Sequence, residues 1–210
     1  MSTADEKLQP TVIVIDDDAN VREALDGLFR SVGLAARLFE SVQDFLDAKV
    51  KDSLGCIVLD VRLPGQSGLD FQECLGRSGK HLPIVFISGH ADIAMSVRAM
   101  KAGAVEFLAK PVRDQDLLDA VQRAVDQDRR QRQDAANNAS LRKTFAMLSR
   151  REQDVMQHVV TGRLNKQIAA DVGLSEATVK LHRGRVMQKM GAKSLVELVR
   201  MADRLGGRPS

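Results

Sequence analysis

The sequence predicts an α/β domain with an open parallel sheet, followed by an all-helical domain. Over residues 1–128, five short apolar runs alternate with helix-like segments, which is the pattern of βαβ units. Residues 129–210 show helical periodicity punctuated by glycines. The charge also changes sign, since residues 1–128 hold 14 Lys and Arg against 21 Asp and Glu, whereas residues 129–210 hold 17 against 7. We therefore expect two domains with different partners, the second a candidate for binding nucleic acid.

The composition is that of a globular protein, with 44% hydrophobic and 28% charged residues among 210. Aromatic residues make up only 3%, so we expect a core of Leu, Val, Ile, Ala and Met. The first ten residues are polar and the apolar runs are too short to cross a bilayer, which predicts a cytoplasmic location without membrane association. Cys56 and Cys74 are expected to be free thiols in a reducing compartment.

The apolar runs define the strands expected in the first domain, at 12–15, 35–39, 56–59, 84–87 and 105–108. Helices are expected over 20–32 and from about residues 41, 67, 92 and 114. Asn20 is the candidate N-cap of the first helix, and Gly33 ends it. Gly76 and Gly103 are expected at the ends of the third and fourth helices, where glycine is common.

The fifth helix begins near Asp114, with an apolar inner face that includes Leu117, Val121 and Val125. Residues 126–139 keep helix-forming side chains but lose this stripe. The segment is either a frayed linker or a solvated continuation of the helix, and we favour the continuation. The expected domains are 1–128 and 145–210, joined by a linker over 129–144.

The second domain is predicted to contain four helices, over 149–161, 165–172, 175–190 and 194–205. Ser149 with Glu152 and Ser194 with Glu197 have the spacing of capping boxes. Only Gly173 and Leu174 separate the second of these helices from the third. This tight turn is typical of a helix-turn-helix. The last helix carries an apolar stripe that serves either packing or dimerisation.

Acidic side chains, a hydroxyl and an amine follow the predicted strands. They are Asp16, Asp17 and Asp18 after the first strand, Asp60 after the third, Ser88 after the fourth and Lys110 after the fifth. Ligands bind at the carboxyl ends of strands in an open parallel sheet, so these groups should share one crevice. Clustered carboxylates repel unless a divalent cation lies between them. The pattern therefore predicts phosphoryl chemistry on an aspartate, with Mg²⁺ or Mn²⁺ as cofactor.

Residues 10–128 resemble the receiver domain of two-component response regulators through the segments VIVIDDD, LDVRLPGQSG, ISGH and FLAKP. Residues 145–205 resemble the LuxR-type helix-turn-helix through LSRRE, NKQIAADVGLSEATVKLHR and KMGAKS. The whole chain is similar to the FixJ/NarL class of regulators. This resemblance implies a flavodoxin-like receiver with strand order 2-1-3-4-5 and a four-helix DNA-binding domain. It also implies a transcriptional regulator that is not a turnover enzyme.

By the same resemblance, Asp60 accepts a phosphoryl group from a sensor histidine kinase or a small phosphodonor. Asp17, Asp60 and the backbone carbonyl of Arg62 would bind the metal directly, and Asp16 would bind it through water. Asp18 falls outside this set and either faces solvent or caps a helix. Lys110 would contact a phosphate oxygen, and a cis bond before Pro111 would aim it into the crevice.

Ser88 and Phe107 are the expected switch residues. Ser88 would hydrogen-bond the phosphate and pull its loop inward, which leaves space for Phe107. His90 lies in that loop and is a candidate for shaping it. The change is expected to alter the face formed by the fourth helix and fifth strand, through which phosphorylated regulators of this kind form homodimers.

The predicted DNA-binding surface lies mainly on the third helix of the second domain. One side of this helix has small residues, one apolar side chain and cations, which suits a major groove. The candidate contacts are Lys166, Thr178, Lys180, Leu181, Arg183, Gly184, Arg185 and Gln188. Arg183 leans inward, so its tip is expected to reach phosphate, and His182 either contacts phosphate or packs on a neighbouring helix. The implied partners are promoter DNA and RNA polymerase.

Two competing interpretations remain at this point. The first is a receiver-like module that ignores phosphate and binds DNA constitutively. The second is a phosphatase that uses an aspartate nucleophile from residues 16–18, but it leaves Asp60, Ser88, Lys110 and the basic domain unexplained.

Overall fold

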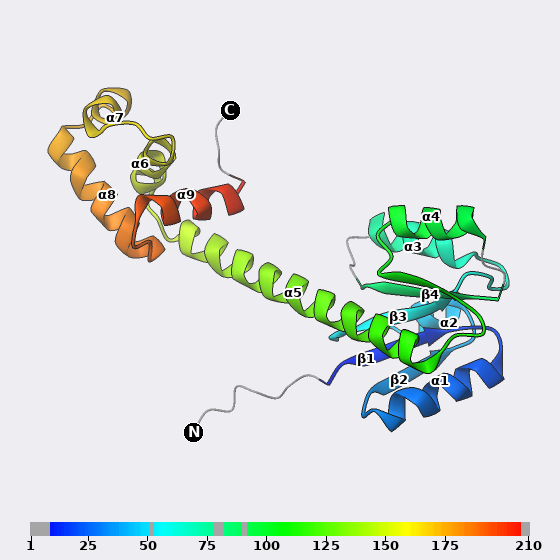
Figure 1. Cartoon of the computed structure of the whole chain (residues 1–210). Coiled ribbons are helices and arrows are strands. Elements are labelled where there is room, and N and C mark those ends of the chain that lie inside the picture. The colour runs from blue at the N-terminus through cyan, green and yellow to red at the C-terminus, as the bar shows by residue number, and fades with distance from the viewer. Residues whose placement is uncertain (1–8, 51–52, 78–81, 90–91, 207–210) are drawn as a thin grey trace, which may run out of the picture. The chain divides into compact units, whose positions relative to one another are not determined.

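The computed structural model describes residues 9–50, 53–77, 82–89 and 92–206. It contains two compact units, Met1–Gln131 and Arg132–Ser210 (Figure 1). Helix α5 (Asp114–Ala146) runs unbroken for 33 residues and contributes to both units. His90, a candidate for shaping the switch loop, lies outside the described residues.

The first unit is built on a five-stranded parallel sheet in the order β2-β1-β3-β4-β5, as predicted (Figure 1). The strands are β1 (Thr11–Ile15), β2 (Ala35–Phe39), β3 (Gly55–Asp60), β4 (Ile84–Ser88) and β5 (Glu106–Ala109). In the register of β1 and β3, Ile15 pairs with Leu59. The residues that follow, Asp16 and Asp60, are therefore neighbours at the carboxyl edge of the sheet.

Helices cover both faces of this sheet. They are α1 (Ala19–Ser31), α2 (Val42–Asp47), α3 (Gly68–Arg77), α4 (Ile93–Lys101) and the first part of α5. Alternate strand residues point to opposite faces, so Val12 and Val14 join one core with α1 and α5, while Ile13 and Ile15 join another with α2, α3 and α4. The expectation of a core without aromatic side chains is wrong, because Phe29 and Phe86 are fully buried.

Two expected helix ends in this unit differ from the structure. Asp18, not Asn20, is the N-cap of α1, and its side chain accepts a 2.8 Å hydrogen bond from the Asn20 amide. Gly76 does not end α3, because the helix continues to Arg77. Gly103 does follow α4, with φ of +90°, a left-handed conformation that favours glycine.

The second unit is helical and packs around its own core. Its helices are the last turns of α5 and then α6 (Arg150–Val160), α7 (Asn165–Val172), α8 (Glu176–Met190) and α9 (Leu195–Arg204). Gly173 ends α7 with φ of +66° and allows the tight turn into α8. The capping box of Ser149 and Glu152 is confirmed, but the second box forms only in part, since Glu197 accepts from the Lys193 amide instead of Ser194.

Both cysteines are free thiols. Cys56 is buried in β3, where loss of solvation and then the charge of Asp128 raise its pKa to about 12. Cys74 lies exposed on α3. Among the described residues, no helix has the length and apolar character needed to cross a membrane.

Candidate functional site

Three carboxylates meet at the carboxyl edge of the sheet. Asp16 and Asp17 follow β1, and Asp60 ends β3. One carboxylate oxygen from each of them lies within 4.8 Å of the other two. Asp16 is fully buried and Asp60 is 6% exposed, whereas Asp17 faces solvent. The sheet register thus produces the cluster that the strand ends predicted.

Lys110 completes this cluster from the end of β5. Its Nζ donates hydrogen bonds of 2.7 Å to Asp16 Oδ2 and to Asp60 Oδ2. The Lys110 amide also donates to the Ser88 carbonyl at 2.8 Å, which joins the ends of β4 and β5. The bond between Lys110 and Pro111 is cis, as expected.

Burial and hydrogen bonding have opposite effects on the pKa of Asp16 and on the pKa of Lys110. Burial raises the pKa of Asp16 above its usual value, despite hydrogen bonds from Lys110 and the Asp18 amide. Burial also opposes the charge on Lys110, but the hydrogen bonds to Asp16 and Asp60 together outweigh it and raise the Lys110 pKa. The ammonium is therefore held in its charged form beside Asp60.

The cluster fits a hard divalent cation. Mg²⁺ binds through oxygen and uses one or two carboxylates together with substrate phosphate and water. The three carboxylates supply such oxygens, and the exposed position of Asp17 leaves the cluster open to solvent. Asp18 does not belong to it, because its side chain caps α1.

Backbone groups orient Asp60. The Arg62 amide donates to Asp60 Oδ1 at 2.9 Å, and the Arg62 side chain is exposed. On the other side, a Cβ at Gly68 would lie 2.4 Å from the Asp60 carbonyl oxygen. Gly68 therefore allows the start of α3 to approach Asp60 closely. Sequence reasoning missed this role, although a glycine in the first turn of a predicted helix was a signal for it.

Ser88 and Phe107 lie on neighbouring strands beside the cluster. Ser88 is fully buried at the end of β4. Phe107 on β5 is half-buried, with its ring centroid 6.0 Å from that of Phe86. A described neighbour of Phe107 is therefore a core ring of β4, the strand that ends at Ser88.

In the second unit, α8 presents the surface predicted to meet DNA. Val179, Val186 and Met190 are buried. Lys180, Leu181, Gly184, Arg185 and Gln188 are exposed, as is Lys166 on α7. Leu181 is 53% exposed, which is unusual for an apolar side chain beside cations, and nothing lies within 4 Å of a Cβ at Gly184. Within the described part of the chain, neither Lys180 nor Arg185 pairs with an acid.

The remaining candidates are partly engaged within the domain. Arg183 is half-buried and donates to Asn165 Oδ1 at 3.2 Å. The Thr178 hydroxyl lies 2.8 Å from the hydroxyl of Ser175, the N-cap of α8. His182 is half-buried, and its Nδ1 is enclosed without a hydrogen-bond partner among the described residues, which favours packing over phosphate contact.

Two segments of the chain match known domain families. Residues 12–122 match the response regulator receiver domain. Residues 146–202 match the luxR family of bacterial regulatory proteins. The matches fall on the unit with the carboxylate cluster and on the unit with the exposed α8 surface, respectively.

Individual relatives extend over nearly the whole chain. Nodulation protein W of Bradyrhizobium diazoefficiens is 54% identical over 93% of this chain and 86% of its own length. The transcriptional regulatory protein FixJ of Azorhizobium caulinodans is 44% identical over 95% of this chain and 94% of its own length. The solved structure of response regulator StyR matches with a TM-score of 0.78 at 45% identity, covering 93% of this chain and 99% of that one.

Proposed function

Because the chain belongs to the response regulators that join a receiver domain to a LuxR-type helix-turn-helix domain, we propose that phosphorylation of Asp60 controls its binding to promoter DNA. The contact of Lys110 with both Asp16 and Asp60 is the observation that carries the proposal. It combines a carboxylate nucleophile, a cation for phosphate oxygens and metal ligands in one crevice. The relatives are regulators, which argues against the phosphatase interpretation.

The proposed donor is a phosphohistidine of a sensor histidine kinase, or a small acyl phosphate. An oxygen of Asp60 forms the new P–O bond while the bond from phosphorus to the donor breaks. With a kinase, the leaving imidazole keeps the electron pair of the P–N bond and takes up a proton. Lys110 then exchanges its contact with Asp60 for one with a phosphate oxygen.

Mg²⁺, or Mn²⁺, would neutralise phosphoryl charge at this site. Asp17, Asp60 and the carbonyl of Arg62 are its proposed direct ligands, and Asp16 would act through water. The carboxylate cluster supports this assignment, since its oxygens lie close enough together to share one cation.

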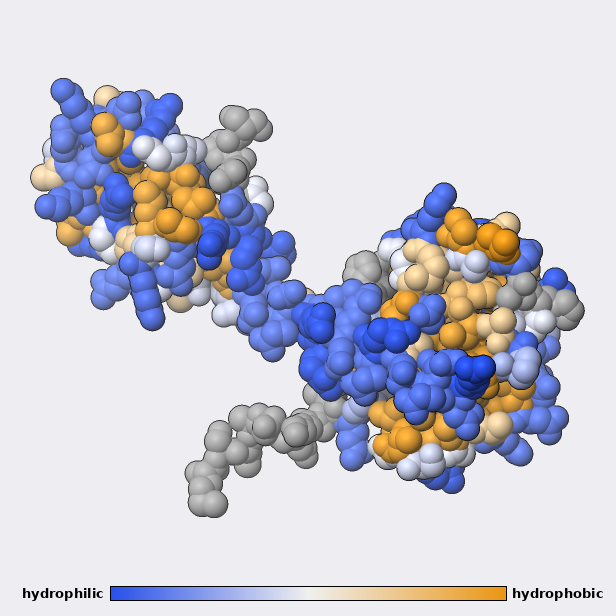
Figure 2. All heavy atoms as spheres, in the orientation of Figure 1, coloured by the Kyte–Doolittle hydropathy of each residue, from blue (hydrophilic) through white to orange (hydrophobic). Residues whose placement is uncertain are grey.

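Ser88 is proposed to donate to the phosphate and Phe107 to move into the space that this leaves. The face that would change is formed by α4 and β5. Ile93 on α4 is 83% exposed, and Val97 and Met100 are each 44% exposed. Figure 2 shows apolar side chains on the surface over this helix. Such a patch supports homodimerisation of the phosphorylated protein through α4 and β5.

The exposed surface of α8 is proposed to enter the major groove of promoter DNA. One such module reads few base pairs, so a dimer would occupy two half-sites about one helical turn apart. RNA polymerase is the further proposed partner, because control of transcription acts on it. Since both promoter DNA and RNA polymerase are cytoplasmic in bacteria, the protein is proposed to act in the cytoplasm.

Asp60→Asn tests the proposed site. We expect the variant to fold, because an amide oxygen can still accept from the Arg62 amide, and to lose phosphate incorporation from a labelled donor. Asp18→Asn is the matched control, since Asn caps a helix as well as Asp and the position lies outside the cluster. It should incorporate phosphate normally.

Labelling of Asp60→Asn at the normal rate would show that another residue accepts the phosphate. Beryllofluoride with Mg²⁺ mimics the phosphorylated aspartate and should raise dimerisation and DNA affinity. If it changes neither, the phosphate-independent module is the better description.

A further inference from the structure

Helix α4 has few buried side chains to hold it in place. Of its nine residues only Ala99 is fully buried, and half-buried Met95 also packs against the core. Its exposed apolar residues face away from the sheet, so hydrophobic burial contributes little to its position. Polar contacts with α3 therefore contribute more to the position of this helix than is usual for a helix packed on a sheet.

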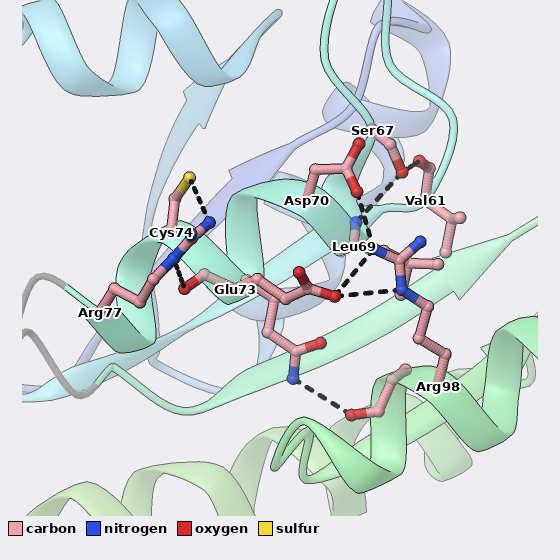
Figure 3. Close-up of polar contacts among 10 residues, drawn as sticks. Val61, Ser67, Leu69, Asp70, Glu73, Cys74, Arg77 and Arg98 are labelled. Atoms are coloured by element: carbon pink, nitrogen blue, oxygen red, sulfur yellow. Dashed lines mark hydrogen bonds and ion pairs between the residues drawn. The ribbon is translucent and has the colours of Figure 1, made fainter.

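Arg98 provides the first of these contacts. It reaches from α4 to two acids one turn apart on α3 (Figure 3). Its Nη2 lies 2.8 Å from Asp70 Oδ1 and 2.8 Å from Glu73 Oε1, and its Nε donates to the same Glu73 oxygen at 3.1 Å. We call Arg98, Asp70 and Glu73 the Arg98 cluster.

Gln72 provides a second contact between α3 and α4. Its side chain is 6% exposed, and its Nε2 donates to the Ala99 carbonyl at 3.2 Å. Its Oε1 is buried without a partner among the described residues. The Gln72 side chain is therefore buried although its oxygen has no partner in the described structure, and its nitrogen bonds to the backbone of α4. This hydrogen bond forms only when α4 lies in this position against α3.

An open groove lies between α4 and the loop that follows β3. Met95 and Arg98 line this groove, which has a volume of about 460 Å³, together with residues of the loop. The loop includes Val61 and Arg62, the first residues after Asp60. On this side of α4, therefore, Met95 and Arg98 border open space, and among the described residues the core contacts of the helix are limited to Met95 and Ala99.

We propose that the Arg98 cluster holds α4 in the arrangement of the unphosphorylated receiver and so sets the activity that is present without phosphate. The inference rests on the proposed function, because it takes the response at Ser88 to reach α4. The chain supports this link, since β4 ends at Ser88 and the N-cap of α4 is Asp92. A cluster that is formed in one arrangement and broken in the other shifts the equilibrium between them.

Exposed ion pairs change an equilibrium by only about two- to fivefold each. Both acidic partners share one Arg98 nitrogen, so the two effects should not multiply in full, and removal of Arg98 should shift the arrangement of α4 by about three- to tenfold. This is a modest change in a regulator, sufficient to raise the unphosphorylated background but not to replace phosphorylation. The cluster would thus keep the activity of the unphosphorylated protein low.

The test uses full-length Arg98→Gln without any phosphodonor. Amide hydrogen exchange in α4 should become about three- to tenfold faster. At a protein concentration where few molecules are dimers, the dimer fraction should rise by a similar factor. Arg77→Gln is the matched control, because Arg77 is an exposed arginine whose hydrogen bonds in the described structure stay within α3. It should leave both measurements unchanged.

A double variant, Asp70→Asn with Glu73→Gln, should reproduce Arg98→Gln, and combining all three changes should add nothing further. Unchanged exchange in α4 of Arg98→Gln would overturn the proposal. Faster exchange without more dimer would overturn its regulatory part, provided that beryllofluoride still drives dimerisation. If beryllofluoride fails in the unaltered protein, the proposed function fails, whereas the exchange result still decides whether the cluster holds α4.

Discussion

Gly68 allows the start of α3 to lie close to the strand that carries Asp60. A methyl group at this position would lie 2.4 Å from the Asp60 carbonyl oxygen and 3.1 Å from Leu59 Cγ. We expect Gly68→Ala to destabilise the receiver by about 1–3 kcal/mol, because the start of α3 must move away. Calorimetry of the receiver transition measures this loss, and phosphate incorporation should slow in parallel.

Gly76→Ala is the control for this prediction. Gly76 lies inside the same helix, and nothing lies within 4 Å of its added Cβ. Alanine there should be neutral or should stabilise the receiver by about 0.5–1 kcal/mol. Equal stability of the two variants would show that the close approach to Asp60 is easily relieved.

Lys180 and Arg185 are the residues on which the proposed DNA surface depends most. If either side chain reads a base, replacing it with Ala should weaken binding to promoter DNA by about 1–3 kcal/mol. If it contacts phosphate, the replacement should reduce by about one the slope of the logarithm of affinity against the logarithm of salt concentration. Phosphorylation at Asp60 should not change. Arg200→Ala, which removes an exposed cation from α9, is the control. Gel shifts over a salt series distinguish the outcomes, and unchanged affinity for both variants would remove this face from the interface.

At the scale of elements, Glu152 connects the start of α6 to the end of α8. The side chain is 3% exposed and accepts hydrogen bonds from Lys189 at 2.6 Å and from the Ser149 amide at 2.8 Å. The hydrogen bond from Lys189 and then that from Ser149 lower the Glu152 pKa from 4.5 to about 2. A pKa lowered by folding means stability that is present above pH 4.5 and is lost as the pH falls toward 2.

Glu152→Gln should therefore cost the helical domain about 1–2 kcal/mol at pH 7, since water partly screens the half-exposed Lys189. Between pH 5 and pH 2 the unaltered domain should lose this advantage, so the two unfolding curves converge. Thermal unfolding at a series of pH values measures it. A constant difference across the series would assign the cost to packing instead of charge.

Most elements were predictable from the sequence because their signals are local. The apolar runs, Gly33, Gly103 and Gly173 all lie where a strand or helix end was expected. The error at the start of α1 concerns two neighbouring residues with similar propensity. Asp18 and Asn20 can both cap a helix, and Asp18 takes the position because its side chain reaches the amide two residues on.

The candidate site was predictable for a similar reason. Groups at strand ends converge in any parallel sheet, so the cluster of Asp16, Asp17 and Asp60 needed only the strand positions. The Arg98 cluster was not predictable, because the facing of α3 and α4 depends on how both helices pack on the sheet. Nothing in the spacing of Asp70, Glu73 and Arg98 along the chain indicates that they meet.

At the scale of the molecule, the last turns of α5 belong to the core of the second unit. Leu141 and Phe145 pack against that core, and Arg204 on α9 donates to Asn138 at 3.0 Å. Gln153 also donates to the Phe145 carbonyl at 3.3 Å. We propose that the folding unit of the DNA-binding domain begins in α5, earlier than residue 145.

A fragment of residues 132–210 should consequently be more stable than one of residues 147–210. The shorter fragment loses two half-buried apolar side chains, worth about 2–3 kcal/mol together. Thermal unfolding followed by circular dichroism compares them directly. Equal midpoints would mean that α5 only rests on the domain without stabilising it.

The two thiols of the receiver differ enough to report on its dynamics. Alkylating reagents attack the thiolate, and Cys74 is exposed on α3, so it should react in the native protein. Cys56 is fully buried in β3, and its pKa of about 12 leaves almost no thiolate at neutral pH. Its labelling must wait until the sheet opens. When the sheet opens and closes faster than the reagent reacts, the ratio of the two labelling rates therefore reports the fraction of molecules with an open sheet, without any engineered probe.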